Sequence, residues 1–490
     1  MSSINGIGLN GSLLLGSQSL GTQQVAIQTI GNNIANINTP GYARQRVNLV
    51  ANAMDGEGGE QDMGASVSSI ESLTSPLLNS LVQQSLGAQG YADNQASLTS
   101  TVQDSLGEQF TASASSSTAS TVATGSGPVQ DALSTFFGDM QTLSDTPTSA
   151  TAQGVVVQDA TTLASTISSA YGRLQNTQSQ IATDASSITT QINQLSQSIA
   201  SLNQQIVQVQ AASGTPANSL VDTQSADIQA LSSLVNVTAT TQSNGSVTLA
   251  LADNSSVVLV DGDDSNGTGD TQSLSASYNP NSAVPLTVSG STTGVLGTGI
   301  PSGGSLGSDL DVANNVIGSP ASVGNTGLLG AMDGVASQLI TQVNAQNEAG
   351  YDANGNAGGT IFTGTGAADI GVNSALANNP SLIATGDGSG PLDGSNALAM
   401  ANIQNSPSII PAFQTMVSGL GQTVSTAATN QTTQDQVTQQ LQTQQNSVSG
   451  VSIDEEMTNL INFQQAYEAS AHFITTISGM FTTLDSIITS

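Results

Sequence analysis

The sequence predicts a mainly α protein with a β-rich part (α+β): paired N- and C-terminal coiled-coil helices, a central elongated helical bundle and a small β-rich insertion. Three observations support this prediction. Apolar residues recur at alternating spacings of three and four near both ends of the chain, a long heptad run occupies residues 181–209, and the pattern changes to period two over 236–260.

The first forty residues predict one helix with a narrow apolar seam. The seam positions carry apolar or small residues with a single Gln, and they are Leu13, Gly16, Leu20, Gln23, Ile27, Ile30, Ile34 and Ile37. Asn38, Thr39, Pro40 and Gly41 should end this helix, because proline lacks a backbone donor and disfavours helix in the residue before it.

The last forty residues predict a second helix of the same kind. Ser452 and Glu455 fit a capping box, and Asp454 and Glu456 add negative charge where the helix dipole is positive. Gln464 and Ser478 fill two seam positions, and the others are Ile453, Met457, Leu460, Tyr467, Ala471, Ile474, Phe481, Leu484 and Ile488. We expect the two terminal helices to pack on each other; the alternative is that both lie in one globular core.

The middle of the chain predicts a rod of helices. Residues 181–209 carry a heptad seam without a break, equivalent to a helix about 43 Å long. The seam residues are Ile181, Ala185, Ile188, Ile192, Leu195, Ile199, Leu202, Ile206 and Val209. Segments 131–170 and 328–347 carry helical spacing as well and should complete an intramolecular bundle.

Period-two segments predict the β-rich part. Residues 236–260 should form short strands with turns at Asn244-Gly245 and Asp253-Asn254, and residues 111–127 should be a flexible spacer. The predicted domains are a terminal helical domain (1–55 and 448–490), a helical rod (56–235 and 325–447) and an outer insertion (236–324).

Composition excludes several classes of function. Lys is absent, and Arg44, Arg46 and Arg173 face 34 carboxylates, for a formal charge of −31. Binding to nucleic acid is therefore excluded and binding to acidic membranes disfavoured, since both need clustered cations. The acidity should serve solubility and mutual repulsion of unassembled chains.

The sequence also argues against a cleaved secretion signal and a membrane span. No positive charge precedes Arg44, the longest N-terminal leucine run is three residues, and no stretch approaches about 18 apolar residues. If the protein is extracellular, we expect it to leave the cell without a cleaved signal.

No pattern predicts catalysis, a cofactor or a metal. The acidic stretch 261–270 should be a solvated turn, because Asn266 and Gln272 replace the Gly and Glu of a calcium loop. His472 is the only histidine and Cys is absent, which leaves little for zinc or a histidine base. The glycine-rich tracts at 289–307 and 385–394 lack the Lys of a phosphate loop.

Two segments carry a resemblance to a known family. NNIANINTPGYARQR (32–46) closely resembles the N-terminal signature of the rod, hook and hook-associated axial proteins of the bacterial flagellum, and VSIDEEMTNLINFQQAYEASAHFITTISGMFTTLDSII (451–488) resembles their C-terminal segment. Interior segments 218–237 and 343–362 are similar to the hook-associated branch. The missing Lys and the loop at 111–127 depart from the usual pattern.

The resemblance implies a structural, extracellular protein of the hook–filament junction, exported by the flagellar type III apparatus. It implies a ring of copies between the hook protein and the next hook-associated protein, and a cytoplasmic chaperone at the C-terminal helix. We expect the terminal helices to fold on assembly, with Pro40, Gly41 and Tyr42 forming the turn into the rod. The expected interface residues are Leu20, Ile27, Ile30, Ile34, Ile37, Met457, Leu460, Phe463, Tyr467, Ala471, Ile474, Phe481 and Leu484.

Three alternatives remain open at this stage. A hook or distal rod subunit would share the terminal motifs and polymerise extensively. A secreted surface adhesin with Ser/Thr-rich stalks would explain the acidity and the spacer, and not the paired terminal motifs. A secreted hydrolase inserted at 210–330 has only stray Ser and Asp residues in its support.

Overall fold

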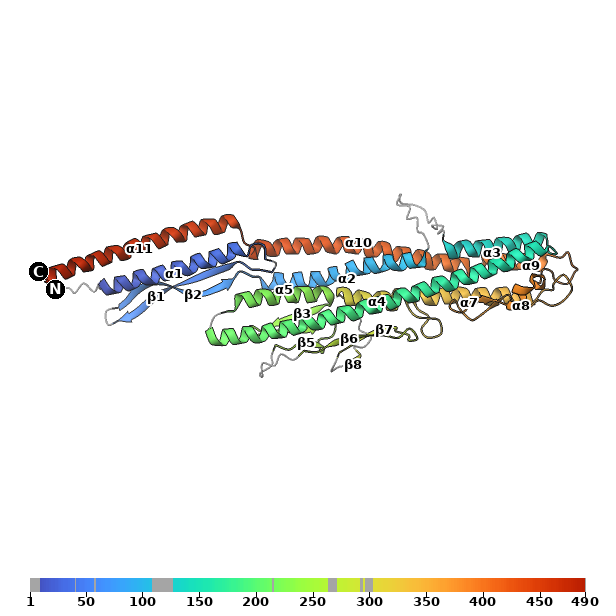
Figure 1. The fold of residues 1–490 in the computed structure, drawn as a ribbon, viewed down its shortest axis with the longest axis horizontal. Coiled ribbons are helices and arrows are strands. Elements are labelled where there is room, and N and C mark those ends of the chain that lie inside the picture. The colour runs from blue at the N-terminus through green and yellow to red at the C-terminus, as the bar shows by residue number, and fades with distance from the viewer. Residues whose placement is uncertain are drawn as a thin grey trace.

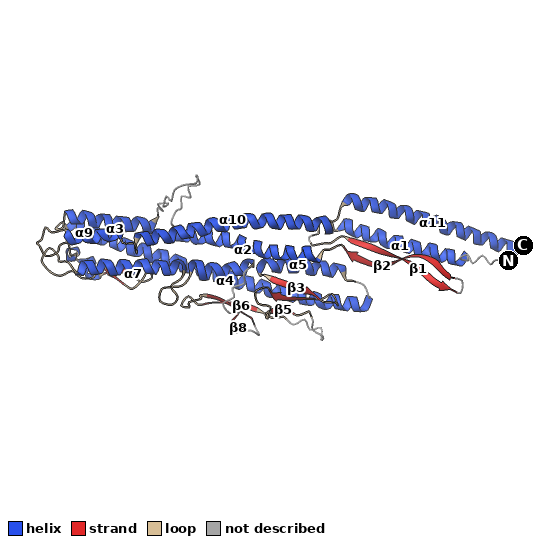
Figure 2. Cartoon of the chain, turned by 180° about the vertical axis from the view of Figure 1, so that it is seen from behind, coloured by secondary structure: helices blue, strands red, loops and turns tan. Residues whose placement is uncertain are grey.

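The chain folds into an elongated molecule with both termini at the same end (Figure 1). A computed structural model describes residues 9–39, 41–56, 59–107, 127–213, 216–262, 271–290, 294–295 and 303–489. Helices run along most of its length, and small antiparallel sheets lie along one side (Figure 2). The predicted fold class, mainly α with a small β-rich part, is confirmed.

The terminal part consists of two helices and a hairpin. Helix α1 (Leu9–Ala35) lies against α11 (Ile453–Thr489), and the strands β1 (Gln45–Gly56) and β2 (Gly59–Ser72) cover another side of α1 (Figure 1). Thr22 Oγ1 donates a hydrogen bond of 2.9 Å to the carbonyl of Ala65 in β2. The sequence analysis did not predict this hairpin, which runs across residue 55, where the first terminal segment was expected to end.

Long helices build the rod. Helices α2 (Pro76–Leu106) and α10 (Ile410–Ser449) run side by side next to the terminal part, with α5 (Asn218–Leu234) and α4 (Ala150–Ser213) beside them (Figures 1 and 2). The shorter elements complete the rod: α3 (Pro128–Asp145), α6 (Gly304–Asp311), the π-helix Val312–Ile317, α7 (Gly327–Glu348), β9 (Phe362–Thr363), β10 (Gly371–Val372), α8 (Ser374–Asn378), the 3₁₀ turns Pro380–Leu382 and Ile403–Asn405, and α9 (Ser395–Asn402).

Helix α4 is the longest element of the rod. Its 64 residues span about 96 Å, roughly twice the predicted segment. The heptad prediction is confirmed for the residues buried in the core, which are Ile181, Ala185, Ile188, Ile192, Ile199, Leu202 and Ile206. Leu195 is half-buried and Val209 is 41% exposed near the helix end.

The predicted helical segment 131–170 is divided in two. Helix α3 ends at Asp145 and α4 begins at Ala150. Pro147 explains the break, because proline disfavours helical backbone in the residue before it, and Thr146 has left the helical region (φ −136°, ψ 58°). The predicted helix at 328–347 is confirmed as α7, with Leu328, Met332, Val335, Leu339 and Val343 all buried.

Two small sheets form the β-rich part beside α4. One contains β3 (Val237–Thr241), β4 (Val247–Leu251) and β5 (Val258–Val260); the other contains β6 (Leu274–Tyr278), β7 (Leu286–Gly290) and β8 (Gly294–Val295). The predicted strands and the turn at Asn244-Gly245 are confirmed, with Gly245 at φ +82°. The spacer at 111–126 and the acidic residues 263–270 lie outside the described residues.

Two asparagine side chains of α4 form hydrogen bonds with backbone groups of the sheets. Asn203 Oδ1 accepts from the Val247 N–H at 2.8 Å and its Nδ2 donates to the Val247 carbonyl at 2.9 Å. Asn193 makes the same pair of bonds to Leu274, both at 2.8 Å. Leu274 lies in the edge strand β6, and Val247 lies beyond the residues of the central strand β4 that pair with β5. In both places a side-chain amide satisfies backbone groups that no neighbouring strand binds.

Aromatic side chains fill the rod end farthest from the termini. The ring centroid of Phe136 lies 5.2 Å from that of Phe137 and 5.5 Å from that of Phe362, both edge-to-face, and each ring is at most 1% exposed. Such pairs add packing energy beyond the burial of their area. They join α3 to β9 at the point where α3 and α9 meet.

Three carboxyl groups in the helices of the rod are poorly solvated. Burial, opposed by the Asn94 amide and assisted by the charge of Asp184, raises the pKa of Asp309 to about 7. Burial and the neighbouring Asp139 raise the pKa of Asp159 to about 6, and burial raises the pKa of Asp222 to about 6. In the folded chain each of these groups therefore holds a proton at a pH where the unfolded chain has lost it.

No helix in the described part of the chain is long and apolar enough to cross a membrane.

Replacing Phe136 by Ala should lower the free energy of unfolding by about 3–5 kcal/mol, since a fully buried ring leaves a cavity. Urea denaturation followed by circular dichroism measures the change. Ser134→Ala, at an exposed position of the same helix, is the control and should change little. Equal stability of the two variants would contradict the described core.

The chain should become less stable as pH rises from about 5 to about 8. A carboxyl group whose folded pKa exceeds its unfolded value stabilises the fold at low pH, and that contribution is lost as pH rises through the folded pKa. Asp309→Asn should remove a share of this loss on the order of 2 kcal/mol, given its pKa of about 7. Urea denaturation at both pH values tests this; an equally steep pH dependence in the variant would contradict it.

Candidate functional site

The surface best suited to function is the terminal helix pair, α1 and α11, together with the region around Asn33, Arg44 and Glu456 where this pair joins the rod. We call this region the neck. In the described part of the chain, no group of three or more His, Asp or Glu side chains is placed to share a metal ion. At the end of the molecule where the termini lie, by contrast, most of the exposed large apolar side chains belong to the terminal helices. Large exposed apolar patches on a soluble chain mark sites of protein association.

Helices α1 and α11 pair in antiparallel orientation. Ser19 Oγ and Ser470 Oγ lie 2.9 Å apart, and Asn33 Nδ2 donates to Glu456 Oε2 at 3.1 Å. A Cβ atom on Gly16 would lie 2.6 Å from Ile474 Cγ1, so any larger residue there would displace Ile474. Small residues in α1 therefore let the helices approach closely, and the predicted pairing of the terminal helices is confirmed.

Helix α1 is buried on a wider face than the predicted seam. Of the expected interface residues, Ile30 is buried, and Leu20, Ile27, Ile34 and Ile37 are half-buried. Ile37 lies in the turn that follows α1, because the helix ends at Ala35.

The residues buried between these seam positions are Thr22, Ala26, Thr29 and Asn33. The hairpin covers a second side of α1, which explains why the buried face is wider than a two-helix seam.

The expected interface residues of α11 fall into two groups that differ in exposure. Leu460, Phe463, Ala471, Ile474 and Phe481 are half-buried. Three others are exposed: Met457 at 44%, Tyr467 at 40% and Leu484 at 49%.

Exposed apolar side chains of α11, some of them at predicted seam positions and some outside the seam, form two rows. Ile453, Met457 and Ile461 form a first apolar row at spacings of four, and Phe473, Met480, Leu484 and Ile487 form a second apolar row. Residues three, four or seven apart lie on the same face of a helix, so each row follows one face of α11. Sequence reasoning missed Ile461, Phe473, Met480 and Ile487, although the spacing of four from Ile453 signals the first row.

A buried asparagine fastens the neck below the helix pair. Asn33 is 1% exposed, and its Oδ1 accepts from Tyr42 Oη and from the Gln45 N–H, both at 2.9 Å. Its Nδ2 donates to the Gln45 carbonyl at 2.9 Å as well as to Glu456. All four hydrogen bonds that an amide side chain can make are therefore used.

One arginine joins the beginning of α11 to the rest of the neck. Arg44 Nε donates to Glu456 Oε1 at 2.7 Å, and Arg44 Nη1 donates to Glu455 Oε2 at 2.5 Å. The Glu456 side chain is only 2% exposed, whereas that of Glu455 is 60% exposed. The Arg44 N–H also donates to the Ser449 carbonyl at 2.8 Å.

The sequence analysis assigned these two glutamates to capping and helix-dipole roles and did not predict their pairing with Arg44. The scarcity of cations, three in the chain, was the available signal.

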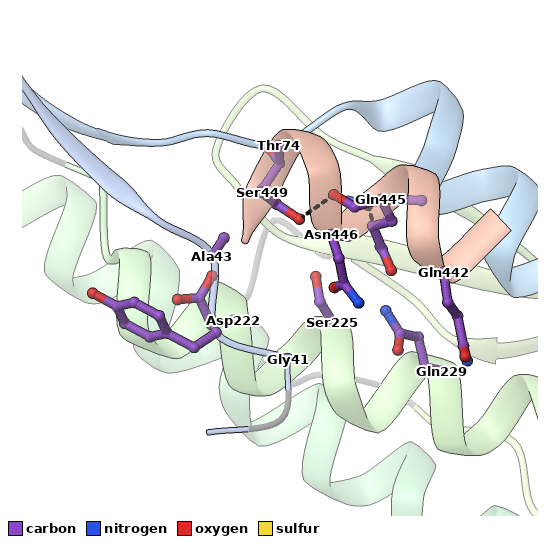
Figure 3. A pocket seen from close by; sticks show the side chains of 12 residues that line it. Gly41, Ala43, Thr74, Asp222, Ser225, Gln229, Gln442, Gln445, Asn446 and Ser449 are labelled. Atoms are coloured by element: carbon purple, nitrogen blue, oxygen red, sulfur yellow. Dashed lines mark hydrogen bonds between the residues drawn. The ribbon is translucent and has the colours of Figure 1, made fainter. Parts of the chain in front are cut away.

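A polar cavity of about 200 Å³ lies on the rod side of the neck, lined by residues of the turn after α1 and of α5 and α10 (Figure 3). Gly41 takes φ +79°, and a Cβ there would lie 3.1 Å from Ala226 Cβ, which explains glycine at the turn. Burial, with the charges of Asp222 and Glu456, raises the pKa of Tyr42 to about 12. The predicted turn residue Pro40 lies outside the described residues.

Comparison with known proteins shows that this chain is similar to flagellar proteins. Residues 115–362 match the family profile described as "Flagellar hook-associated protein FlgK helical domain". Residues 442–487 match "Flagellar basal body rod FlgEFG protein C-terminal", and residues 13–42 match "Flagella basal body rod protein". The matches at the two ends cover α11 and most of α1.

Individual proteins agree with the profiles. The chain is 26% identical to flagellar hook-associated protein 1 of Bacillus subtilis over 488 residues, covering 92% of each chain. It is 41% identical to flagellar hook-associated protein 1 of Salmonella typhimurium over 101 residues, 19% of this chain and 18% of that one. The solved structure of the flagellar hook junction protein FlgK from Burkholderia pseudomallei shares the fold, with a TM-score of 0.58 and 18% identity, over 76% of this chain and all of that one.

Replacing Arg44 by Gln should loosen α11 from the neck. The buried Glu456 carboxylate would lose its cation, a change that costs about 3–5 kcal/mol at buried pairs. Hydrogen exchange should rise in residues 453–470, and Arg44→Gln combined with Glu456→Gln should recover part of the protection. Arg173→Gln, whose guanidinium binds the Ser105 and Leu106 carbonyls in the rod, is the control. Unchanged exchange at α11 in Arg44→Gln would contradict the role of this pair.

Proposed function

Because this chain belongs to the flagellar hook-associated protein FlgK family, structural proteins of the hook–filament junction, we propose that its terminal helices assemble into a ring of copies there. The observation that carries the proposal is the exposure of both apolar rows of α11 at the end where the termini lie. Neighbouring copies would cover these rows, with the hook protein on one side of the ring and the next hook-associated protein on the other.

Burial of the apolar rows supplies the driving force. Each large side chain that a neighbour covers contributes up to about 1.5–3 kcal/mol before the cost of ordering. Assembly must also overcome the repulsion between chains with a formal charge of −31 each. Free chains therefore stay apart until the ring geometry covers several apolar side chains at once, and the terminal helices become fully ordered in that step.

The same exposed apolar surface means that the chain needs protection before it is exported and assembled. An exposed apolar helix in the cytoplasm needs a partner, so a chaperone binds α11 until the flagellar type III apparatus exports the chain. The location of the assembled protein is then the extracellular flagellum. The role is structural and involves no catalysis, cofactor or metal.

A hook or distal rod subunit is the second candidate, because the two end segments match rod protein profiles. The match over 115–362 favours the hook-associated assignment, since it covers the helical rod that the terminal profiles leave out. A surface adhesin gains no support from the terminal helix pair.

Deleting the gene in its host tests the proposed function. Cells should keep hooks and release unpolymerised filament protein into the medium, and the intact chain should restore filaments. Filaments that remain attached and rotate without the chain would overturn the proposal. Loss of the hooks themselves would favour the hook or rod subunit.

Met457→Asp should abolish filament attachment without unfolding the rod, since Met457 is 44% exposed in the first apolar row and a charge there opposes burial. Complementation of the deletion strain and motility measure the effect. The matched control is Leu392→Asp, at a residue 78% exposed in the loop before α9, which should retain motility. Motile cells carrying Met457→Asp would count against the interface.

A further inference from the structure

A groove in the terminal part of the chain lies between α1, β1 and α11, at the same level along α11 as the first apolar row. Its volume is about 380 Å³, and its apolar part is lined by Ala26 and Ile30 of α1, Val47 of β1, Leu73 and Phe463 of α11. Polar and charged side chains, among them Arg44 and Glu456, line the rest. Ala26 and Ile30 are buried, whereas Val47, Leu73 and Phe463 are half-buried and still offer apolar surface. The groove could therefore accept one or two large apolar side chains.

The rim of the groove carries an exposed cation. Arg46 lines the groove and makes no ion pair or side-chain hydrogen bond within the described part of the chain. Glu71 lies directly opposite Arg46 in the hairpin, but its Oε1 accepts from Ser69 Oγ at 3.2 Å, and the Arg46 guanidinium is not within ion-pair distance. The other two cations are engaged, Arg44 with Glu455 and Glu456, and Arg173 with backbone carbonyls.

The first apolar row of α11 carries a matching carboxylate. Glu468 lies seven residues after Ile461, two helical turns along the same face. It is exposed and makes no ion pair or side-chain hydrogen bond among the described residues. Met457, Ile461 and Glu468 thus present an apolar strip that ends in a negative charge, complementary to the apolar part of the groove and to Arg46 on its rim.

We propose that the first apolar row of one copy fills this groove on the next copy, with Glu468 of α11 paired across the interface with Arg46. The groove and the row lie on different faces of one terminal helix pair, so the contact is heterologous and repeats from copy to copy. Such a contact builds a ring when the rotation closes. The inference rests on the proposed assembly and names the surfaces that carry it.

The absence of cysteine makes a clean cross-linking test possible. Cells lacking the gene would produce two forms together, Arg46→Cys and Glu468→Cys, and isolated hook–filament junctions would be treated with a short bis-maleimide. A flexible linker is preferable to a disulfide, because two long side chains that meet hold their Cα atoms farther apart than a disulfide allows. We expect a covalent dimer when both forms are present, and none from either form alone.

Glu468→Cys combined with Leu392→Cys, in the loop before α9, is the matched control and should give no dimer. Normal filaments with no Arg46–Glu468 dimer would overturn the interface and leave the junction function intact. If the chain restores no junction at all, the proposed function fails instead.

Neutral variants identify the partner of Arg46. Arg46→Gln and Glu468→Gln should each reduce filament attachment, with about a fivefold weaker contact per interface, and the double variant should be no worse than either alone. Glu71→Gln should have no such effect. If Glu71→Gln reproduces the loss and Glu468→Gln does not, Arg46 acts within its own hairpin and the inference is wrong.

Discussion

The buried carboxylate of Glu456 sets the geometry of the terminal part. A carboxylate that is 2% exposed needs both a cation and hydrogen-bond donors, and Arg44 and Asn33 supply them. These side chains come from the end of α1, the segment before β1 and the beginning of α11. The backbone of Arg44 adds the end of α10 through Ser449 and the segment after β2 through Leu73. One ionic contact therefore fixes the direction in which the terminal helices leave the rod.

The rod and the terminal part differ in how far they bury their own apolar surface. In the rod, long helices bury their seams on each other, and the amides of Asn203 and Asn193 in α4 satisfy backbone groups of β4 and β6. In the terminal part, α11 has 37 residues and α1 has 27 described ones. Continuing the register of Ser19 with Ser470 places Leu9 opposite Met480, so Leu484 and Ile487 extend past the described start of α1. Leu484 is 49% and Ile487 66% exposed in the single chain.

Periodicity predicted the two terminal helices and parts of the rod and of the sheets, because burial of one face makes apolar residues recur at the period of the helix or strand. The spacing predicted α7 and the 181–209 part of α4, and the period-two pattern predicted β3 to β5. The hairpin β1–β2 was missed, although Val47 and Leu49 alternate with polar residues before Asp55-Gly56, a turn sequence. The neck contacts could not be predicted from spacing, since Asn33, Arg44 and Glu456 are distant in sequence and meet only after the helices pair. A seam pattern also shows where apolar residues lie and not which partner covers them, so it did not separate Leu460, half-buried, from Met457, exposed.

We propose that the apolar rows of α11 are the surface that assembly covers. Hydrogen exchange compared between the free chain and isolated hook–filament junctions tests it most directly. We expect strong added protection in α1 and α11 on assembly and little change along α4, whose core is already buried in the single chain. Added protection confined to the rod and the β-rich part, with α11 unchanged, would contradict it.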